Sequence, residues 1–161
     1  RVDSLAFSVK STSDIARVSG PADLAGKKVI VGSGTNQERI LLGWNAENEA
    51  AGRQPALPVY LTDDASGNLY IQSGRADVFF GPQSVAAYKA ALSGKTKVVG
   101  LGPKKAYVAT TTKKGNGLAP ALQAALNGAI ARGEYQKVLA RWGEQGEEVT
   151  QSEVNPPGIT Y

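Results

Sequence analysis

Hydrophobic and polar residues alternate over residues 3–10, where Leu5, Phe7 and Val9 fall on one side. Such alternation predicts a β-strand with one buried face. Further short apolar runs, bounded by Gly, Pro, Asn or Asp, predict five more strands. These runs are residues 27–31, 57–61, 76–80, 97–99 and 107–112.

Segments with helical spacing separate most of these runs. The first covers residues 36–51, places Ile40, Leu41 and Trp44 on one face, and is followed by Gly52, a residue typical of helix ends. Other helices are expected at residues 67–73, 84–92, 119–131 and 134–142. Strands that alternate with helices predict an α/β fold with a mostly parallel sheet flanked by helices. The tail, residues 144–161, has little periodicity.

The junction after the run 27–31 reads Gly32-Ser33-Gly34-Thr35-Asn36-Gln37-Glu38. Thr35 followed by Glu38 is typical of a capping box, so the helix should begin at Asn36. The first backbone N–H groups of a helix lack intrahelical partners and carry the positive end of its dipole. A carboxylate, phosphate or sulfate is therefore favoured there, and the junction predicts a site for a small anionic or zwitterionic molecule.

A second strand-to-helix junction, Gly81-Pro82-Gln83, follows the run 76–80. Pro82 stands where proline is favoured, in the first turn of a helix. Ligands of open α/β sheets bind beyond the carboxyl ends of the strands. We therefore expect the two junctions to face one crevice.

Composition narrows the chemistry. The chain has 161 residues, 42% of them hydrophobic, and contains neither cysteine nor histidine. A structural zinc site, a thiolate nucleophile, a disulfide framework and a histidine general base are excluded. The junction at Gly32 lacks the third glycine of a dinucleotide fingerprint, and no phosphate-binding P-loop occurs, so no cofactor is expected. No apolar run approaches the ~20 residues that span a bilayer.

The net charge of +4 does not indicate nucleic-acid binding. Lysines occur in scattered pairs, such as Lys27 and Lys28, without an arginine-rich helix or an aromatic RNA-binding motif. A solvated basic surface explains the charge.

Four segments, in order along the chain, resemble the signatures of family 3 extracellular solute-binding proteins, the periplasmic or lipid-anchored receptors that deliver polar amino acids to ABC importers. They are DLAGKKV at 23–29, GTNQE at 34–38, SGRADV at 73–78 and GEYQKVLARW at 133–142. The resemblance implies two α/β lobes of the type II periplasmic-binding-protein fold, joined by two hinge strands that close around the ligand. It implies a receptor and not an enzyme.

The resemblance also implies a domain organisation. Residues 1–107 look like the complete second lobe, and residues 108–161 like the C-terminal strand and helices of the first lobe. The beginning of the first lobe, with any signal peptide or lipid anchor, would be missing. Apolar surface exposed by that truncation predicts self-association or binding to the chain's own N-terminal lobe fragment. The expected partners are a small carboxylate ligand and a membrane ABC permease, in the periplasm or outside the cell.

Ligand-binding residues follow from the same resemblance. Thr35, Asn36 and Gln37 match the positions that bind the ligand carboxylate. Gly32, with Ser33 beside it, matches a position that contacts the ligand side chain. Pro82 departs from the family pattern, because many members have an aspartate there for the ligand ammonium. Gln83 could replace it with a neutral acceptor, and Asp63 or Asp64 with a charge. Because of the departure at Pro82, a substituted amino acid, an opine or another carboxylate also fits as the ligand.

Simpler interpretations stay open for several residues. Thr35 and Glu38 are also explained as a helix cap alone. Asp77, at a strand entrance, is better explained as part of a turn than as a catalytic group. Trp44 and Trp142 are expected in the core.

Two other functions are compatible with the fold. One is an enzyme of dehydratase or lyase type, for which only fold-level analogy speaks. The other is the ligand-binding sensor lobe of a membrane receptor. A sensor would continue into a transmembrane helix, whereas this sequence ends in residues 155–161, which favours a free receptor.

Overall fold

The computed structural model describes residues 1–61 and 64–158. Five strands, five α-helices and two short 3₁₀ helices are assigned in this part of the chain. In chain order they are β1 (Val2–Lys10), η1 (Pro21–Leu24), β2 (Lys28–Ile30), α1 (Asn36–Ala50), β3 (Leu57–Val59), α2 (Asp64–Gln72), β4 (Val78–Pro82), α3 (Gln83–Ser93), β5 (Thr96–Tyr107), α4 (Leu118–Ala131), α5 (Glu134–Trp142) and η2 (Gln145–Glu147).

The chain folds into two compact units. The larger unit is Leu5–Pro103, and the smaller unit combines Arg1–Ser4 with Lys104–Tyr161. Strands β1 and β5 both contribute residues to each unit, so the chain passes between the units twice. Residues 1–107 were expected to form one lobe. Residues 1–4 and 104–107, at the two ends of that range, group with the C-terminal segment instead.

The strands form one mixed sheet in the order β3-β2-β4-β1-β5. Strand β2 pairs in parallel with both β3 and β4, and β1 runs antiparallel to β4. The parallel pairs are joined through helices, as crossover connections require. The predicted α/β class with a mainly parallel sheet is confirmed.

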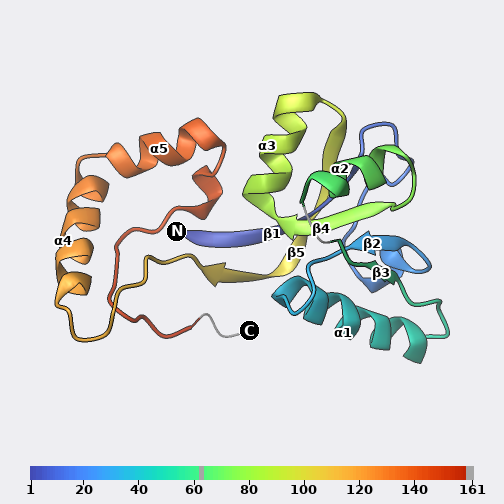
Figure 1. The fold of residues 1–161 in the computed structure, drawn as a ribbon, viewed down its shortest axis with the longest axis horizontal. Helices are drawn as coiled ribbons and strands as arrows, with labels where there is room; N and C mark the ends of the chain where they lie inside the picture. The colour runs from blue at the N-terminus through green and yellow to red at the C-terminus, as the bar shows by residue number, and fades with distance from the viewer. Residues whose placement is uncertain (62–63, 159–161) are drawn as a thin grey trace. The chain divides into compact units, whose positions relative to one another are not determined.

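Helices cover both faces of this sheet. Figure 1 shows α1 on one side and α2 and α3 on the other. The main core lies on the α1 side and includes Phe7, Phe80 and Leu41. A smaller cluster on the other side is built around Ile30 and Ile71.

Successive residues of one strand enter different clusters. In β4, Phe80 belongs to the main core and Phe79 packs against the smaller cluster, as the alternation of side chains along a strand requires. Strand β1 was expected to bury one face. It buries both, because Ser4, Ala6 and Ser8 are covered as well as Leu5, Phe7 and Val9.

One predicted strand is absent. Residues 107–112 were expected to form a sixth strand, but β5 continues from Thr96 to Tyr107 and residues 108–112 have no regular structure. The run Thr110-Thr111-Thr112 has high β-propensity, which acts only where a neighbouring strand offers hydrogen bonds. The prediction was therefore wrong in splitting β5 and in extending it.

The smaller unit holds its polar tail by side-chain contacts. The side-chain amide of Asn127 on α4 binds the backbone of Ser152 twice. It accepts from the Ser152 N–H at 2.7 Å and donates to the Ser152 carbonyl at 3.2 Å. The hydroxyl of Tyr135 accepts from the N–H of Val149. These tertiary contacts fix the tail, although its sequence has little periodicity. The tail also contains η2.

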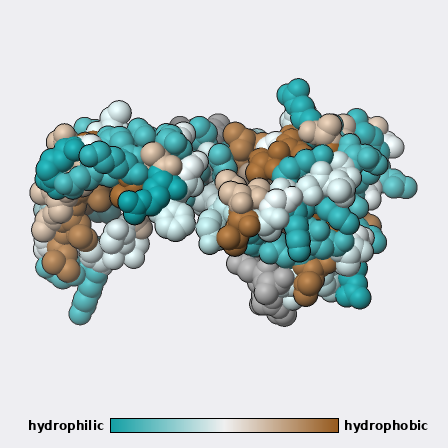
Figure 2. Space-filling model, turned by 90° about the horizontal axis from the view of Figure 1, so that it is seen from above, coloured by the Kyte–Doolittle hydropathy of each residue, from teal (hydrophilic) through white to brown (hydrophobic). Residues whose placement is uncertain are grey.

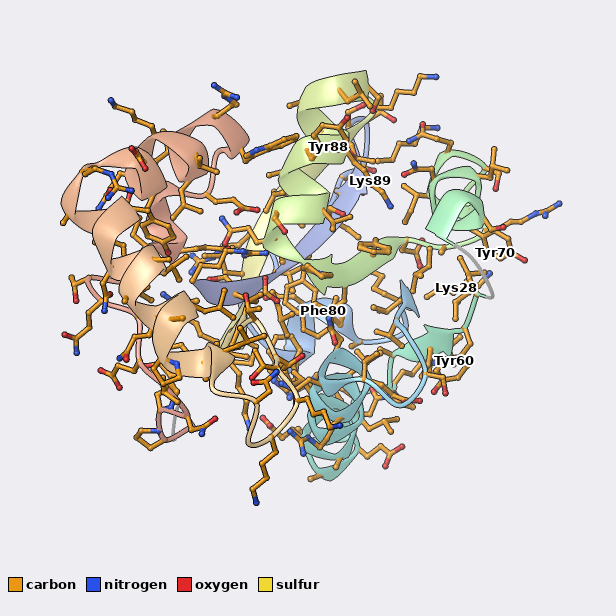
Figure 3. The ribbon with its side chains drawn as sticks, turned by 60° about the vertical axis from the view of Figure 1, so that its left-hand side comes forward. Lys28, Tyr60, Tyr70, Phe80, Tyr88 and Lys89 are labelled. Carbon is orange, nitrogen blue, oxygen red and sulfur yellow. The ribbon has the colours of Figure 1, made fainter. Side chains whose placement is uncertain are left out.

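Phe80 provides a test of the core. It is 1% exposed, its ring lies 4.0 Å from the ring of Phe7, and Figure 3 shows it between β4 and α1. Phe80→Ala is expected to lower the free energy of unfolding by about 3–5 kcal/mol, because it leaves a cavity. Leu92→Ala, at a side chain 72% exposed, should change it little. Equal urea midpoints for the two variants would contradict this placement of the core.

Candidate ligand site

The pairing of β2 with β4 brings the two predicted junctions to one edge of the sheet. In this parallel pair Val29 lies opposite Val78 and Ile30 opposite Phe79. Gly32 lies two residues after Ile30, and Gly81 lies two residues after Phe79. Because parallel strands end at the same edge, the starts of α1 and α3 both lie at this edge.

Helix α1 begins at Asn36, as predicted, and Thr35 is its N-cap. The Thr35 hydroxyl accepts from the Glu38 N–H at 3.3 Å and donates to the Gly32 carbonyl at 2.7 Å. A Cβ at position 32 would lie 2.9 Å from the Thr35 methyl group, so glycine lets Thr35 approach. Since the hydroxyl proton is given to Gly32, Thr35 has no side-chain proton left to donate to a bound carboxylate.

The carboxylate of Glu38 completes only part of the expected capping box. It accepts from the N–H of Gly34 at 2.6 Å, one residue before the N-cap, instead of from Thr35. Gly34 has a φ of +72°, a backbone conformation that glycine adopts readily. A hydrogen bond from the Tyr60 hydroxyl, followed by the one from Gly34, lowers the pKa of Glu38, so this side chain is charged at neutral pH.

A broad surface hollow of about 430 Å³ opens at the start of α1. It is lined by Gly34, Thr35, Asn36, Glu38, Arg39 and Leu42. The N–H groups of Asn36 and Gln37 belong to the first helical turn and have no acceptor within the helix. The Asn36 side chain is engaged separately, because its Oδ1 accepts from the Arg39 guanidinium. The start of the helix is thus open to solvent and not plugged by packed side chains.

The predicted residues differ in their exposure and place. Gly32 and Ser33 are exposed, and Gln37 is partly exposed, but none of these three lines the hollow. Pro82 is the last residue of β4 and precedes α3 as its N-cap, so the expectation of a proline in the first helical turn was wrong by one residue. Gln83 begins α3 and is partly exposed.

Asp63 and the side chain of Asp64 lie outside the described part of the chain. The structure therefore does not test them as partners for a ligand ammonium.

The simpler interpretations of Asp77, Trp44 and Trp142 have different outcomes. The Asp77 carboxylate accepts from the N–H of Lys28 at 2.8 Å and so ties a turn to β2, as expected of a structural residue. Trp44 packs against the main core and stacks on Phe7. Trp142 was expected in the core and is 57% exposed, so that prediction was wrong. A helical position next to apolar residues does not decide which face of a short helix is covered.

Sequence reasoning missed Tyr60, Arg39 and Leu42. Tyr60 follows β3 and reaches Glu38 only because β2 and β3 are neighbours, which the sequence does not show. Figure 3 shows its place at the end of β3. Arg39 and Leu42 could have been found from helical spacing, since Arg39 lies three residues after Asn36 and Leu42 lies three residues after Arg39.

Two further properties bear on the chemistry. Among the described residues no group of three or more acidic, histidine or cysteine side chains could hold a metal ion. No helix in the described part combines the length and apolar character needed to cross a membrane.

Comparison with known proteins supports the fold. No model of a protein family matches the sequence, and no curated protein sequence matches it. Among solved structures, the chain is similar to YtmK of Bacillus subtilis, described as a probable amino-acid ABC transporter extracellular-binding protein. The two share 25% identity with a TM-score of 0.73, over 90% of this chain and 61% of YtmK.

Two other structures show the same fold. AbpA of Streptococcus pneumoniae, an amino acid ABC transporter substrate-binding protein bound to L-arginine, is 20% identical, with a TM-score of 0.71 over 92% of this chain and 60% of AbpA. The second substrate-binding domain of Lactococcus lactis GlnP, in an open conformation, is 20% identical, with a TM-score of 0.61 over 88% of this chain and 58% of that domain.

The chain therefore spans about three fifths of the length of these structures. It has the type II periplasmic-binding-protein fold, and its structural neighbours are the extracellular binding proteins of amino-acid ABC transporters.

Proposed function

We propose that this chain is part of an extracellular solute-binding receptor that holds a polar amino acid, or a related carboxylate, for an ABC importer. The observation that carries this proposal is the open start of α1, where Asn36 lines a surface hollow and the N–H groups of Asn36 and Gln37 have no acceptor within the helix. Helix dipole and unpaired donors together favour a carboxylate at this place. The solved structures with the same fold are binding proteins, which supports a receptor over an enzyme.

The ligand carboxylate would accept hydrogen bonds from the backbone of Asn36 and Gln37. Thr35 would act by holding the turn in place, since its hydroxyl is already bonded on both sides. Gly32, Ser33 and Gln83 would line the neighbouring part of the site, along the edge where β2 and β4 end. Pro82 offers neither a charge nor an N–H, so the partner of a ligand ammonium must be another group.

Closure of two lobes around the ligand would complete the site. The closed form would be selected because it alone makes contacts from both lobes. This chain covers 61% of YtmK, so the opposite wall would come from the part of such a receptor that the chain does not match. We therefore expect the 161-residue chain alone to bind amino acids weakly. Micromolar binding in isothermal titration would contradict that expectation.

The backbone donor at residue 36 can be removed without removing the helix. Proline at the first helical position lacks the N–H and fits there, and Thr35 already has the extended conformation, with ψ of 168°, that a residue before proline requires. Asn36→Pro is expected to reduce the NMR shift changes that L-arginine causes at residues 34–37. Weak binding is measurable in this way.

Asn36→Ala is the matched control. It also removes the side-chain bond to Arg39 but keeps the backbone N–H. It should retain the response to L-arginine. A response equal in both variants would show that the residue 36 amide does not bind the ligand.

Glu38 should set the charge of the acceptable ligand. Its ionised carboxylate lies at the hollow and repels a second negative charge on a ligand held by the neighbouring amides. Glu38→Gln is expected to improve binding of L-glutamate relative to L-glutamine by about threefold, as for charges several ångströms apart in water. Glu47→Gln, on an exposed part of the same helix, should leave this ratio unchanged. An unchanged ratio in Glu38→Gln would exclude this role.

We propose that an apolar stripe on the smaller unit packs against the N-terminal part of the first lobe or, in its absence, against a second copy of the chain. Helix α4 has no buried residue, and Leu118, Leu122 and Leu126, spaced four apart, are 52%, 43% and 43% exposed. Figure 2 shows apolar patches on the α4–α5 part of the molecule. In a whole receptor the N-terminal part of the first lobe would cover the stripe.

The chain alone is then expected to self-associate through the same stripe. Sedimentation should show dimers or larger species that become monomers when all three leucines are changed to serine. A monomeric parent chain with normal solubility would count against this proposal.

A further inference from the structure

Among the described residues, Glu147 is the one charged residue that is buried. It lies in η2 and is 2% exposed. Burying a carboxylate is unfavourable unless it is paired and hydrogen-bonded. Burial raises the pKa of Glu147, although the Ser4 N–H and the Arg1 guanidinium act in the opposite direction. The partners that compensate this burial show which segments Glu147 joins.

Both carboxylate oxygens of Glu147 bind the segment Arg1–Ser4. Oε1 accepts from the Ser4 N–H at 3.2 Å, and Oε2 accepts from the Arg1 guanidinium. Arg1 also lies 3.5 Å from Glu144 and 3.5 Å from Asp3. The C-terminal segment around η2 is thus tied to the beginning of β1 by one buried carboxylate and its partners.

The contact between Glu147 and Ser4 lies where the chain passes from one unit to the other. Ser4 is the last residue of β1 that belongs to the smaller unit, and Leu5 is the first that belongs to the larger one. The second passage of the chain between the units lies between Pro103 and Lys104. Glu147 therefore binds the backbone of the residue at which the first passage begins.

The larger unit holds the same strand just beyond this point. Leu5 packs directly against Gly102, where an added Cβ would lie 2.7 Å from the Leu5 Cβ and 3.1 Å from the Phe80 ring. β1 is thus fixed by Glu147 on one side of the Ser4–Leu5 peptide and by close packing on the other. Movement of one unit against the other must be concentrated in the short links between them.

We infer that Glu147 is a positioning residue that anchors the hinge of the smaller unit and thereby sets the balance of open and closed forms, without touching the ligand. This inference rests on the proposed function for its effect on binding. Loss of the anchor leaves the segment 1–4 held by the backbone bonds of Arg1 with Val108 and by the neighbouring β5. This weaker attachment loosens the link and favours the many open arrangements over the single closed one.

Spin-label distances test the anchor without any ligand. The chain has no cysteine, so Glu49→Cys on α1 and Ala131→Cys at the end of α4, both exposed, can carry one label in each unit. Glu147→Ala is expected to broaden the distribution of distances between the labels. Glu134→Ala is the matched control, because it removes an exposed ion pair with Arg132 in the same unit. A Glu147→Ala distribution that superimposes on the parent overturns the inference.

Glu147→Gln covers the case in which the alanine variant does not fold. Glutamine keeps an acceptor for the Ser4 N–H but loses the charge pair with Arg1, so a smaller broadening is expected. An unchanged distribution in a folded Glu147→Gln overturns the inference as well.

Binding of L-arginine to a receptor that also contains the opposite wall completes the test. Glu147→Ala is expected to weaken it by about two- to thirtyfold, the range for mutations that act on coupling from a distance. Broader distances with unchanged affinity would overturn the claim that the anchor sets closure. If neither L-arginine nor any other polar amino acid binds the parent, the proposed function fails, whereas the distances still decide whether Glu147 anchors the hinge.

Discussion

The hydroxyl of Thr35 joins the end of β2 to the first turn of α1, and the candidate site depends on this contact. By donating to Gly32 and accepting from Glu38 it fixes the chain direction from residue 32 to residue 38. The neighbouring N–H groups of Asn36 and Gln37 are then held in place before any ligand arrives. A preorganised donor pair needs no rearrangement on binding, which would favour a ligand at the proposed site.

The same turn carries a negative charge of its own. Glu38 takes the N–H of Gly34 and is held by Tyr60 from the neighbouring strand. A site with free amides beside a fixed carboxylate favours ligands of mixed charge over dianions. In the proposed receptor, the one side chain of Glu38 would both support the helix start and select the ligand.

The sheet explains why the site lies where it does. Parallel pairing of β2 with β4 places two strand-to-helix junctions at one edge, and helices on both faces keep the sheet rigid behind them. Strands β1 and β5 extend past this unit, and the buried contact of Glu147 with Ser4 holds β1 where it leaves.

Local sequence was sufficient for much of the fold. The start of α1 at Asn36 and the bounds of α5 follow from residues within a few positions, because caps and helical spacing are local interactions. The structural role of Asp77 was likewise recognised from its turn sequence. By contrast, residues 108–112 have strand propensity but no strand, since propensity cannot supply a partner.

The sequence by itself determined that this protein is an α/β chain, without thiol or imidazole chemistry, that presents helix-start amides at Asn36 and Gln37. Only the tertiary structure decided that Tyr60 reaches Glu38, that both faces of β1 are buried, that Trp142 is exposed and that Glu147 is enclosed against Ser4. Glu147 lies 143 residues from Ser4, so their contact exists only once the smaller unit has folded. Capping and periodicity act between residues a few positions apart, whereas burial and hinge contacts depend on which distant segments meet.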